Sequence, residues 1–296
     1  MVVSGFNVMP CYHPWLAYQC LDGSVVSVER KGKGAVVRTL TLPCGQCVGC
    51  RLERSRQWAI RCMHEAQLHE RNSFVTLTYK GDVPDEGLRY RDFQLFMKRL
   101  RKYASGQQIR FYMCGEYGDE KGRPHFHACL FGYDFDDKVL FSNRGGNKLY
   151  TSKILEDLWK YGMCSIGEVT FESAAYVARY IMKKITGTLA DDHYNGLTPE
   201  FCHMSLKPGI GSGWFEKFNS DIFPDGTVVV RGVKTKLPRY YDKLESKKDV
   251  EVLEEVKYNR FRDAVKHFED QTEERLSVRE QVAIARINKL KRNLGE

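Results

Sequence analysis

The chain has 296 residues, a formal net charge of +8, and a composition that is 42% hydrophobic and 28% charged. It is long enough to bury a core, and it contains no run of about eighteen apolar residues, which argues against a membrane-spanning helix. The N-terminus lacks the basic-then-apolar pattern of a secretory signal, so the ten cysteines are expected to be reduced or metal-bound in a cytoplasm. The positive charge favours a polyanionic partner without identifying one.

The periodicity of apolar residues predicts a series of strands and helices. The first two strands, at residues 24–29 and 35–42, are joined by a segment rich in Gly and Lys and are expected to form a hairpin. The predicted elements that follow are a helix at 52–69, a strand at 73–79, a helix capped by Asp92 and running to about residue 103, strands at 109–115 and 125–132, a helix at 153–161, a strand at 165–171 and a helix at 173–185. This order predicts an α+β fold in which an antiparallel sheet carries helices on one face.

The C-terminal part of the chain is less regular. Gly and Pro interrupt residues 187–245, where one hairpin-like strand is predicted at 227–233. From Asp249 the chain is highly charged, with apolar residues at helical spacing, which predicts a solvent-facing helical tail. We therefore divide the chain into a cysteine-rich element at 1–50, a sheet-containing core at 51–187, a loop-rich extension at 188–245 and a charged helical tail at 246–296.

Two histidines lie two positions apart in the strand predicted at 125–132. Residues at that spacing project from the same face, so His125 and His127 can bind one metal ion. Glu116 lies nine positions upstream of His125, across a turn-like segment, and could supply a carboxylate ligand. This set suits Mg²⁺ or Mn²⁺ when a substrate oxygen completes the coordination, and Zn²⁺ and Fe²⁺ are also compatible. The alternative is an ordinary strand histidine beside a solvated loop acid.

Two tyrosines lie four positions apart in the helix predicted at 173–185. That spacing brings the hydroxyl groups of Tyr176 and Tyr180 to the same side of a helix. A tyrosine that attacks a phosphodiester forms a covalent phosphotyrosine and frees a 3′-hydroxyl group. Arg179 and Lys183 are close enough in sequence to stabilise the negative charge of a phenolate or a phosphate. The alternative is that both rings are core aromatics.

Three cysteines at intervals of three positions indicate a second metal site. Cys44, Cys47 and Cys50 are separated by glycine-containing pairs, which is typical of thiolate ligands to zinc. We expect Cys11 to be the fourth ligand. The substitutes considered for it are Cys20, His13, Cys62 and His64. An iron–sulfur cluster is disfavoured because the Cys-Pro that ends the ferredoxin pattern is missing, and the remaining alternative is unliganded thiols in a turn.

Two clusters of basic residues could contact a phosphate backbone. One lies on the helix predicted at 52–69, and the other on the helix that Asp92 caps. The clusters consist of Arg51, Arg54, Arg56 and Arg61, and of Lys98, Arg99, Arg101 and Lys102. For each cluster, a solvated helix face is an equally good interpretation.

The chain resembles the HUH endonucleases at the residues described above. His125-Phe126-His127 is similar to their His-hydrophobe-His motif, residues 74–79 to their first motif, and Tyr176, Tyr180 and Lys183 to their tyrosine motif. Glu116 lies where replication initiators of small single-stranded DNA viruses have their third metal ligand. The segments at 11–14, 43–51, 207–211 and 238–242 resemble stretches of the replication initiators of gokushoviruses, which are small DNA phages.

This resemblance implies an HUH-endonuclease, RRM-like fold at 51–187 and a catalytic Mg²⁺ or Mn²⁺ bound by His125, His127 and Glu116. It also implies nicking of DNA at a viral origin, a 5′-phosphotyrosine intermediate, rolling-circle replication and rejoining of the ends. The expected partner is the viral origin, with a host helicase and polymerase as further candidates, in the cytoplasm of an infected bacterium. The alternatives are an HUH relaxase or transposase, a non-catalytic protein that binds single-stranded nucleic acid, and a structural zinc protein of the virion.

Overall fold

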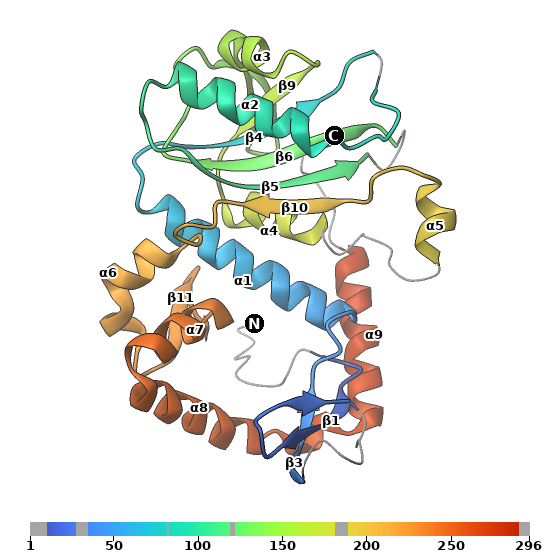
Figure 1. Cartoon of the computed structure of the whole chain (residues 1–296), viewed down its shortest axis with the longest axis vertical. Helices are drawn as coiled ribbons and strands as arrows, with labels where there is room; N and C mark the ends of the chain where they lie inside the picture. Colours follow the sequence, from blue (N-terminus) through green and yellow to red (C-terminus); the bar gives the residue numbers. More distant parts are fainter. Residues whose placement is uncertain (1–10, 28–34, 82, 119–121, 181–188, 290–296) are drawn as a thin grey trace. The chain divides into compact units, whose positions relative to one another are not determined.

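A computed structural model describes residues 11–27, 35–81, 83–118, 122–180 and 189–289, apart from the side chain of Tyr180 (Figure 1). These residues form two compact units. The smaller unit contains the described residues up to Arg54 together with those from Glu254 onward, and the larger unit runs from Ser55 to Leu253.

The larger unit is built on a seven-stranded antiparallel sheet with the order β10-β5-β6-β4-β9-β8-β7. Its strands are β4 (Asn72–Thr78), β5 (Arg110–Tyr117), β6 (Pro124–Phe131), β7 (Val139–Arg144), β8 (Asn147–Thr151), β9 (Cys164–Gly167) and β10 (Phe201–Met204). The predicted α+β fold with a large antiparallel sheet is confirmed. The strands β7, β8 and β10 were not predicted, because short, polar strands at the edges of a sheet lack a clear alternation of apolar residues.

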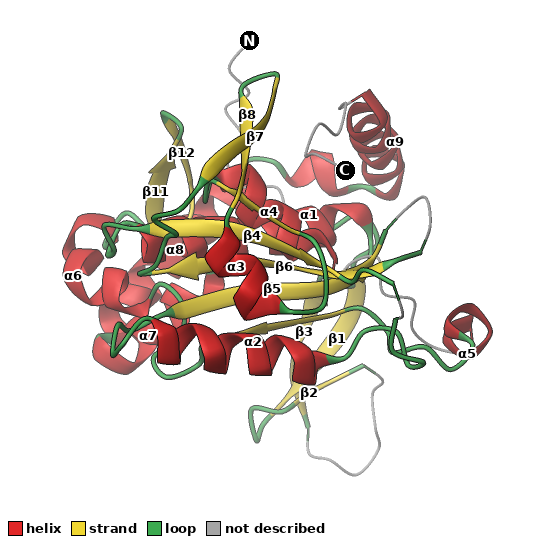
Figure 2. Ribbon diagram, turned by 90° about the horizontal axis from the view of Figure 1, so that it is seen from above, coloured by secondary structure: helices red, strands yellow, loops and turns green. Residues whose placement is uncertain are grey.

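Helices cover both faces of this sheet, whereas the sequence predicted helices on one face (Figure 2). On one face, α2 (Tyr90–Tyr103) and α3 (Lys153–Trp159) pack Phe96 and Trp159 into the core. On the other, α1 (Val48–Ala66) and α4 (Phe171–Tyr180) pack against Tyr112 and Cys129. The reason is that almost every residue of β5 and β6 is buried, and strands that are apolar on both faces need cover on both.

The smaller unit contains a three-stranded sheet with the order β2-β1-β3. Its strands are β1 (Trp15–Cys20), β2 (Val25–Val26) and β3 (Val36–Leu42), and its helical segments are the later part of α8 (Val250–Val265), η1 (Phe268–Gln271) and α9 (Glu273–Lys289). The hairpin predicted between 24–29 and 35–42 is therefore wrong, because β2 and β3 both pair with β1. Local alternation cannot specify which strand is the partner. Residues 28–34 of that prediction lie outside the described residues.

The C-terminal tail is helical, as predicted, but it is only partly solvent-facing. Leu276 of α9 is buried within the smaller unit. Near it in sequence, Oε2 of Glu280 lies 2.7 Å from Nε2 of His13, and the guanidinium of Arg279 lies 5.9 Å from the ring centroid of Tyr12. These contacts join the last described helix to the N-terminal cysteine-bearing segment.

The loop-rich extension contains more regular structure than the sequence predicted. Its elements are α5 (Leu189–Tyr194), α6 (Ser212–Ile222), β11 (Thr227–Val230), β12 (Val233–Lys236) and α7 (Arg239–Lys248). The strand predicted at 227–233 is β11 with the turn that leads into β12.

The two glycine- and tyrosine-containing motifs of this extension meet on α1. Nε of Arg61 donates to the carbonyl oxygen of Ile210 at 3.0 Å, and its guanidinium stacks on Tyr240 at 3.9 Å. The amide of Gly211 donates to Oε2 of Glu65 at 2.6 Å. Gly211 has a φ of 81°, and a Cβ there would lie 2.6 Å from the hydroxyl of Tyr241, so this position requires glycine. The resemblance at 207–211 and 238–242 therefore reflects packing.

A buried histidine in this contact makes stability depend on pH. His64 stacks on Trp214, its Nδ1 lies 2.8 Å from the hydroxyl of Tyr241, and burial lowers its pKa to about 3. Above pH ~6.5 the ring is neutral in both states; below that, the unfolded chain binds a proton that the folded ring does not. We expect the free energy of unfolding to fall by up to ~1.4 kcal/mol per pH unit from this group as the pH drops from ~6 to ~4.

Urea unfolding at pH 7, 6, 5 and 4 measures this dependence. The variant His64→Phe keeps an aromatic ring against Trp214 and removes the titrating group, so its stability should change less steeply over the same range. Equal slopes for the variant and the original chain would show that His64 is not responsible.

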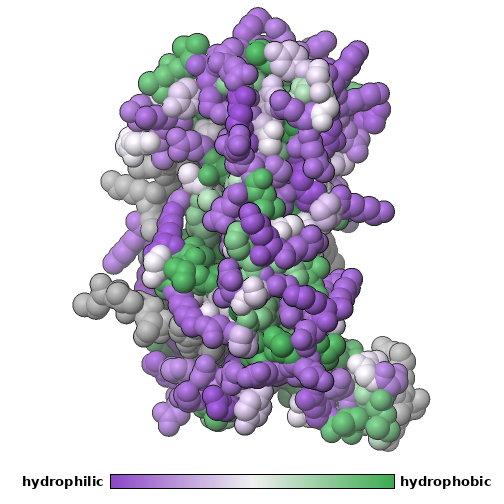
Figure 3. Space-filling model, turned by 90° about the vertical axis from the view of Figure 1, so that its left-hand side faces the viewer, coloured by the Kyte–Doolittle hydropathy of each residue, from purple (hydrophilic) through white to green (hydrophobic). Residues whose placement is uncertain are grey.

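The surface is mostly hydrophilic. The face in Figure 3 shows hydrophobic side chains only in scattered patches between charged ones. Among the residues that the structure describes, none of the helices has the combination of length and apolar character needed to cross a bilayer.

Candidate active site

The pairing of strands in the sheet brings Glu116, His125 and His127 together. β5 and β6 form an antiparallel pair in which Glu116 lies directly opposite His125. His127 is two residues further along β6 and therefore lies on the same face as His125. Oε1 of Glu116 is 2.8 Å from Nε2 of His125 and 2.7 Å from Nε2 of His127. The carboxyl group is thus a buried strand residue, and the alternative of a solvated loop acid is wrong.

Hydrogen bonds to the other ring nitrogens orient the two imidazoles. Nδ1 of His125 lies 3.0 Å from the carbonyl oxygen of Arg123, which can only accept, so Nδ1 carries the proton. Nδ1 of His127 lies 2.9 Å from Oγ1 of Thr76, the residue directly opposite it on β4. With the proton on each Nδ1, both Nε2 lone pairs point toward the same carboxylate oxygen. Such a group of acceptors is unfavourable unless a proton or a cation lies between them.

The charge of Glu116 fits a cation at this point. Burial raises its pKa, but the hydrogen bonds and charges of His125 and His127 outweigh burial and hold the pKa below its ordinary value. Its second oxygen, Oε2, is buried and has no hydrogen-bond partner among the described residues. The ligand atoms of the three residues all lie within 4.8 Å of one another, so the group could hold a metal ion. Two imidazoles and one carboxylate also leave coordination positions for a substrate.

Helix α4 places Tyr176 beside this group. Ala174, Val177 and Ala178 are fully buried against the sheet, which fixes the helix over β5 and β6. The hydroxyl of Tyr176 lies 3.4 Å from Oε1 of Glu116, and its ring is edge-on to His127 with a centroid distance of 5.0 Å. Tyr176 is therefore at the site and is only partly buried.

The other residues of the tyrosine motif are described less completely. The guanidinium carbon of Arg179 lies 5.9 Å from the ring centroid of Tyr176. Tyr180 is the last residue of α4, but its side chain is outside the described part of the chain, as is the whole of Lys183. Their roles stay predictions.

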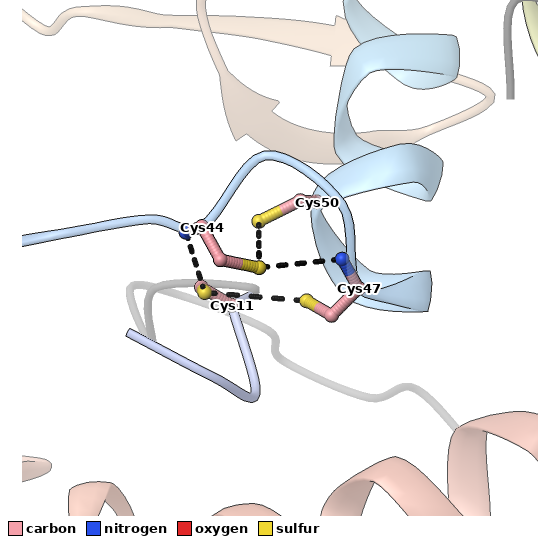
Figure 4. A group of neighbouring side chains, drawn as sticks. All are labelled: Cys11, Cys44, Cys47 and Cys50. Carbon is pink, nitrogen blue, oxygen red and sulfur yellow. Dashed lines mark hydrogen bonds between the residues drawn. The ribbon is translucent and has the colours of Figure 1, made fainter. Parts of the chain in front are cut away.

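The smaller unit contains a second candidate metal site, made of Cys11, Cys44, Cys47 and Cys50 (Figure 4). The Sγ atoms of Cys44 and Cys50 are 4.0 Å apart, as are those of Cys11 and Cys47. Four sulfurs around a tetrahedral zinc ion, with Zn–S distances of about 2.3 Å, would be separated by about 3.8 Å. Of the fourth ligands considered, the structure brings Cys11 to the group and not Cys20, His13, Cys62 or His64.

Backbone amides prepare this cysteine group for negative charge. The amides of Tyr12, Cys44 and Cys47 point at cysteine sulfurs at 3.2–3.3 Å. Although burial raises the pKa of Cys44, these and neighbouring amide contacts lower it to about 7, whereas burial raises the pKa of Cys50. Thiolates at all four positions therefore require a cation to offset their charge, which is what structural zinc provides.

The basic residues of α1 and α2 are mostly engaged within the protein. Nη1 of Arg56 donates to the carbonyl oxygen of Lys236 at 2.8 Å, and Arg61 is held by Ile210 as described above. Arg99 and Arg101 donate to the carbonyl oxygens of Leu158 at 2.6 Å and of Ile109 at 3.0 Å. These four arginines stabilise the fold, and they are poor candidates for a continuous phosphate-binding surface.

Comparison with known proteins identifies relatives over most of the chain. Residues 72–185 match the model of a family described as replication-associated protein ORF2. The chain is 35% identical to the replication-associated protein VP4 of Bdellovibrio phage phiMH2K over 79% of this chain and 76% of that protein. It is 33% identical to the replication-associated protein ORF2 of Spiroplasma virus 4 over 79% of this chain and 80% of that protein. No solved structure matches the chain.

Proposed function

Because the chain belongs to the replication-associated proteins of microviruses, we propose that it initiates rolling-circle replication by nicking viral DNA with a tyrosine nucleophile. The observation that carries this proposal is the position of Tyr176, whose hydroxyl lies 3.4 Å from the Glu116 oxygen toward which both histidines point. A nucleophile and a group suited to a divalent cation therefore lie next to each other on one face of a sheet.

In this proposal the phenol oxygen of Tyr176 attacks the phosphorus of a phosphodiester. The bond from phosphorus to the 3′-oxygen breaks, the protein is linked to the 5′-phosphate, and the 3′-oxygen takes up a proton and becomes a primer. A Mg²⁺ or Mn²⁺ ion bound by Glu116, His125 and His127 would polarise the phosphate and offset its developing charge. Arg179 adds positive charge beside the ring. Tyr180 is proposed as the second nucleophile, which lets the ends be rejoined, and Lys183 as a charge-stabilising group.

The experiment that tests the function uses single-stranded oligonucleotides that tile the genome encoding the chain. With MnCl₂, one of them should be cut and a covalent protein–DNA adduct should appear on a denaturing gel, and EDTA should abolish both. The alternative of a non-catalytic nucleic-acid-binding protein requires binding without any cut or adduct in MnCl₂. The proposed setting is the cytoplasm of the bacterial host, with its helicase and polymerase extending the primer.

A prediction about metal affinity follows from the hydrogen bond between Thr76 and His127. Because that bond orients the imidazole, Thr76→Val should weaken Mn²⁺ binding by ~10- to 100-fold, as measured by calorimetric titration, and Thr76→Ser should restore it. The control is Thr78→Val, which makes the same change opposite His125. Equal affinities for Thr76→Val and the original chain would show that the threonine does not position the ligand.

A further inference from the structure

The β7–β8 hairpin forms a ribbon at the edge of the sheet that the proposed chemistry does not use (Figure 2). β8 pairs with β9 through a single residue pair, Tyr150 with Ile166. The part of the hairpin beyond Tyr150 therefore has no third strand beside it among the described residues. Gly145 and Gly146, with φ values of 58° and 87°, form the tight turn at the tip.

The ribbon combines exposed apolar side chains with positive charge. Val139, Leu140 and Phe141 are 65%, 53% and 72% exposed. Between residues 138 and 151 there are three cationic side chains and no acidic one. Lys138 pairs with Asp134, but Arg144 and Lys148 are exposed and make no ion pair among the described residues. An exposed ribbon of this charge is complementary to a polyanion.

The register of the sheet shows which face of the ribbon is on the side of the candidate active site. Thr76 lies opposite His127, Ser165 opposite Thr76, and these residues share a face. Because Tyr150 pairs with Ile166, the next residue, Thr151, continues this row on β8. Side chains alternate along a strand, so Leu149 and Asn147 lie on the same face as Thr151.

Arg144 is paired with Asn147 and therefore lies on the His127 side, whereas Asn143 and Lys148 lie on the opposite side. Three strand spacings of about 4.8 Å and four residues of about 3.3 Å place Asn147 on the order of 20 Å from His127. This corresponds to about six base pairs of B-form DNA.

We propose that the β7–β8 ribbon binds duplex DNA beside the cleavage site, with Arg144 and Asn147 facing the DNA; this rests on the proposed nicking function. The major groove admits a two-stranded β-ribbon, and Arg and Asn side chains hydrogen-bond to phosphates and base edges there. Phe141 supplies an apolar contact at the bulge between Leu140 and Ser142.

The salt dependence of binding tests this assignment. Binding of the full-length chain to a 30-base-pair duplex is measured by fluorescence anisotropy in EDTA at several NaCl concentrations, so that no nicking is required. Each phosphate contact contributes about 0.9 to the slope of log K against log [NaCl]. Arg144→Ala should lower the slope by about one, and Lys148→Ala, which removes the same charge from the other face, should change it less.

Phe141→Ala gives an independent measurement, because it should weaken duplex binding by about tenfold without changing the slope. An unchanged slope for Arg144→Ala, or equal changes for Arg144→Ala and Lys148→Ala, would overturn the proposal. So would a change in oligomeric state on sedimentation without a change in DNA binding, since the free edge of β7 would then bind a second copy. Adduct formation on a short single strand should be unaffected, so failure of the ribbon and failure of the nicking function are distinguishable.

Discussion

Replacing both Tyr176 and Tyr180 by phenylalanine should abolish the covalent adduct between the protein and DNA. The ring packing against His127 is retained in the variant, but the attacking oxygen is lost. Cleavage should fall by on the order of 10⁴-fold or more, as for the loss of other catalytic nucleophiles. The measurement is a denaturing gel with 5′-labelled and 3′-labelled strands, because only the fragment with the 5′-phosphate is expected to carry the protein.

The single variants separate the two tyrosines. Tyr176→Phe alone should remove the adduct if this residue makes the first cut, as its distance of 3.4 Å from Glu116 leads us to expect. Tyr258→Phe is the matched control, since it removes the same hydroxyl from an exposed tyrosine of α8. A persistent adduct in the double variant would mean that another residue is the nucleophile, even if nicking itself is confirmed.

Removing one cysteine of the proposed zinc site should unfold the element around it. Apparent binding free energies of structural zinc are ~10–16 kcal/mol in isolated zinc fingers, so losing one ligand removes most of the stabilisation of a small unit. In Cys47→Ser we expect the zinc content to fall from about one ion per chain to near zero. The amide of Tyr12 points at the sulfur of Cys47, and Arg279 of α9 contacts the ring of Tyr12. Trypsin should therefore cut α9 faster in the variant.

Cys20→Ser is the control for this experiment. Cys20 is buried in β1 of the same unit but is not part of the four-cysteine group. Its variant should keep the zinc and the slow cleavage of α9. A Cys47→Ser protein with undiminished zinc, measured by atomic emission, would contradict the proposed ligand set.

Local patterns were sufficient for part of the candidate site. The two-residue spacing of His125 and His127 within a strand placed both on one face, because side chains alternate along any strand. The three-residue spacing of Cys44, Cys47 and Cys50 likewise indicated a metal site from the sequence alone. The choice of Glu116 depended on a family resemblance, and the strand register then placed it opposite His125.

Other features were not accessible from local patterns. Thr76 is 51 positions from His127 and becomes its partner only through the pairing of β4 with β6. Arg61 was considered as a phosphate-binding residue, but it is held by Ile210, which lies 149 positions away. The sequence contains no signal for such contacts, because a carbonyl oxygen is present at every residue and only the fold selects one.

The sequence by itself determined the α+β class, the residue types of two metal sites and the presence of a tyrosine helix, because periodicity and short spacings act within a single element. Only the tertiary structure decided which atoms converge. It placed Cys11 with three cysteines that follow more than thirty positions later, and Tyr176 beside Glu116 across 60 positions. It also covered both faces of the sheet and left the β7–β8 ribbon exposed. These outcomes depend on strand pairing and on the burial of whole faces, which are properties of segments far apart in the chain.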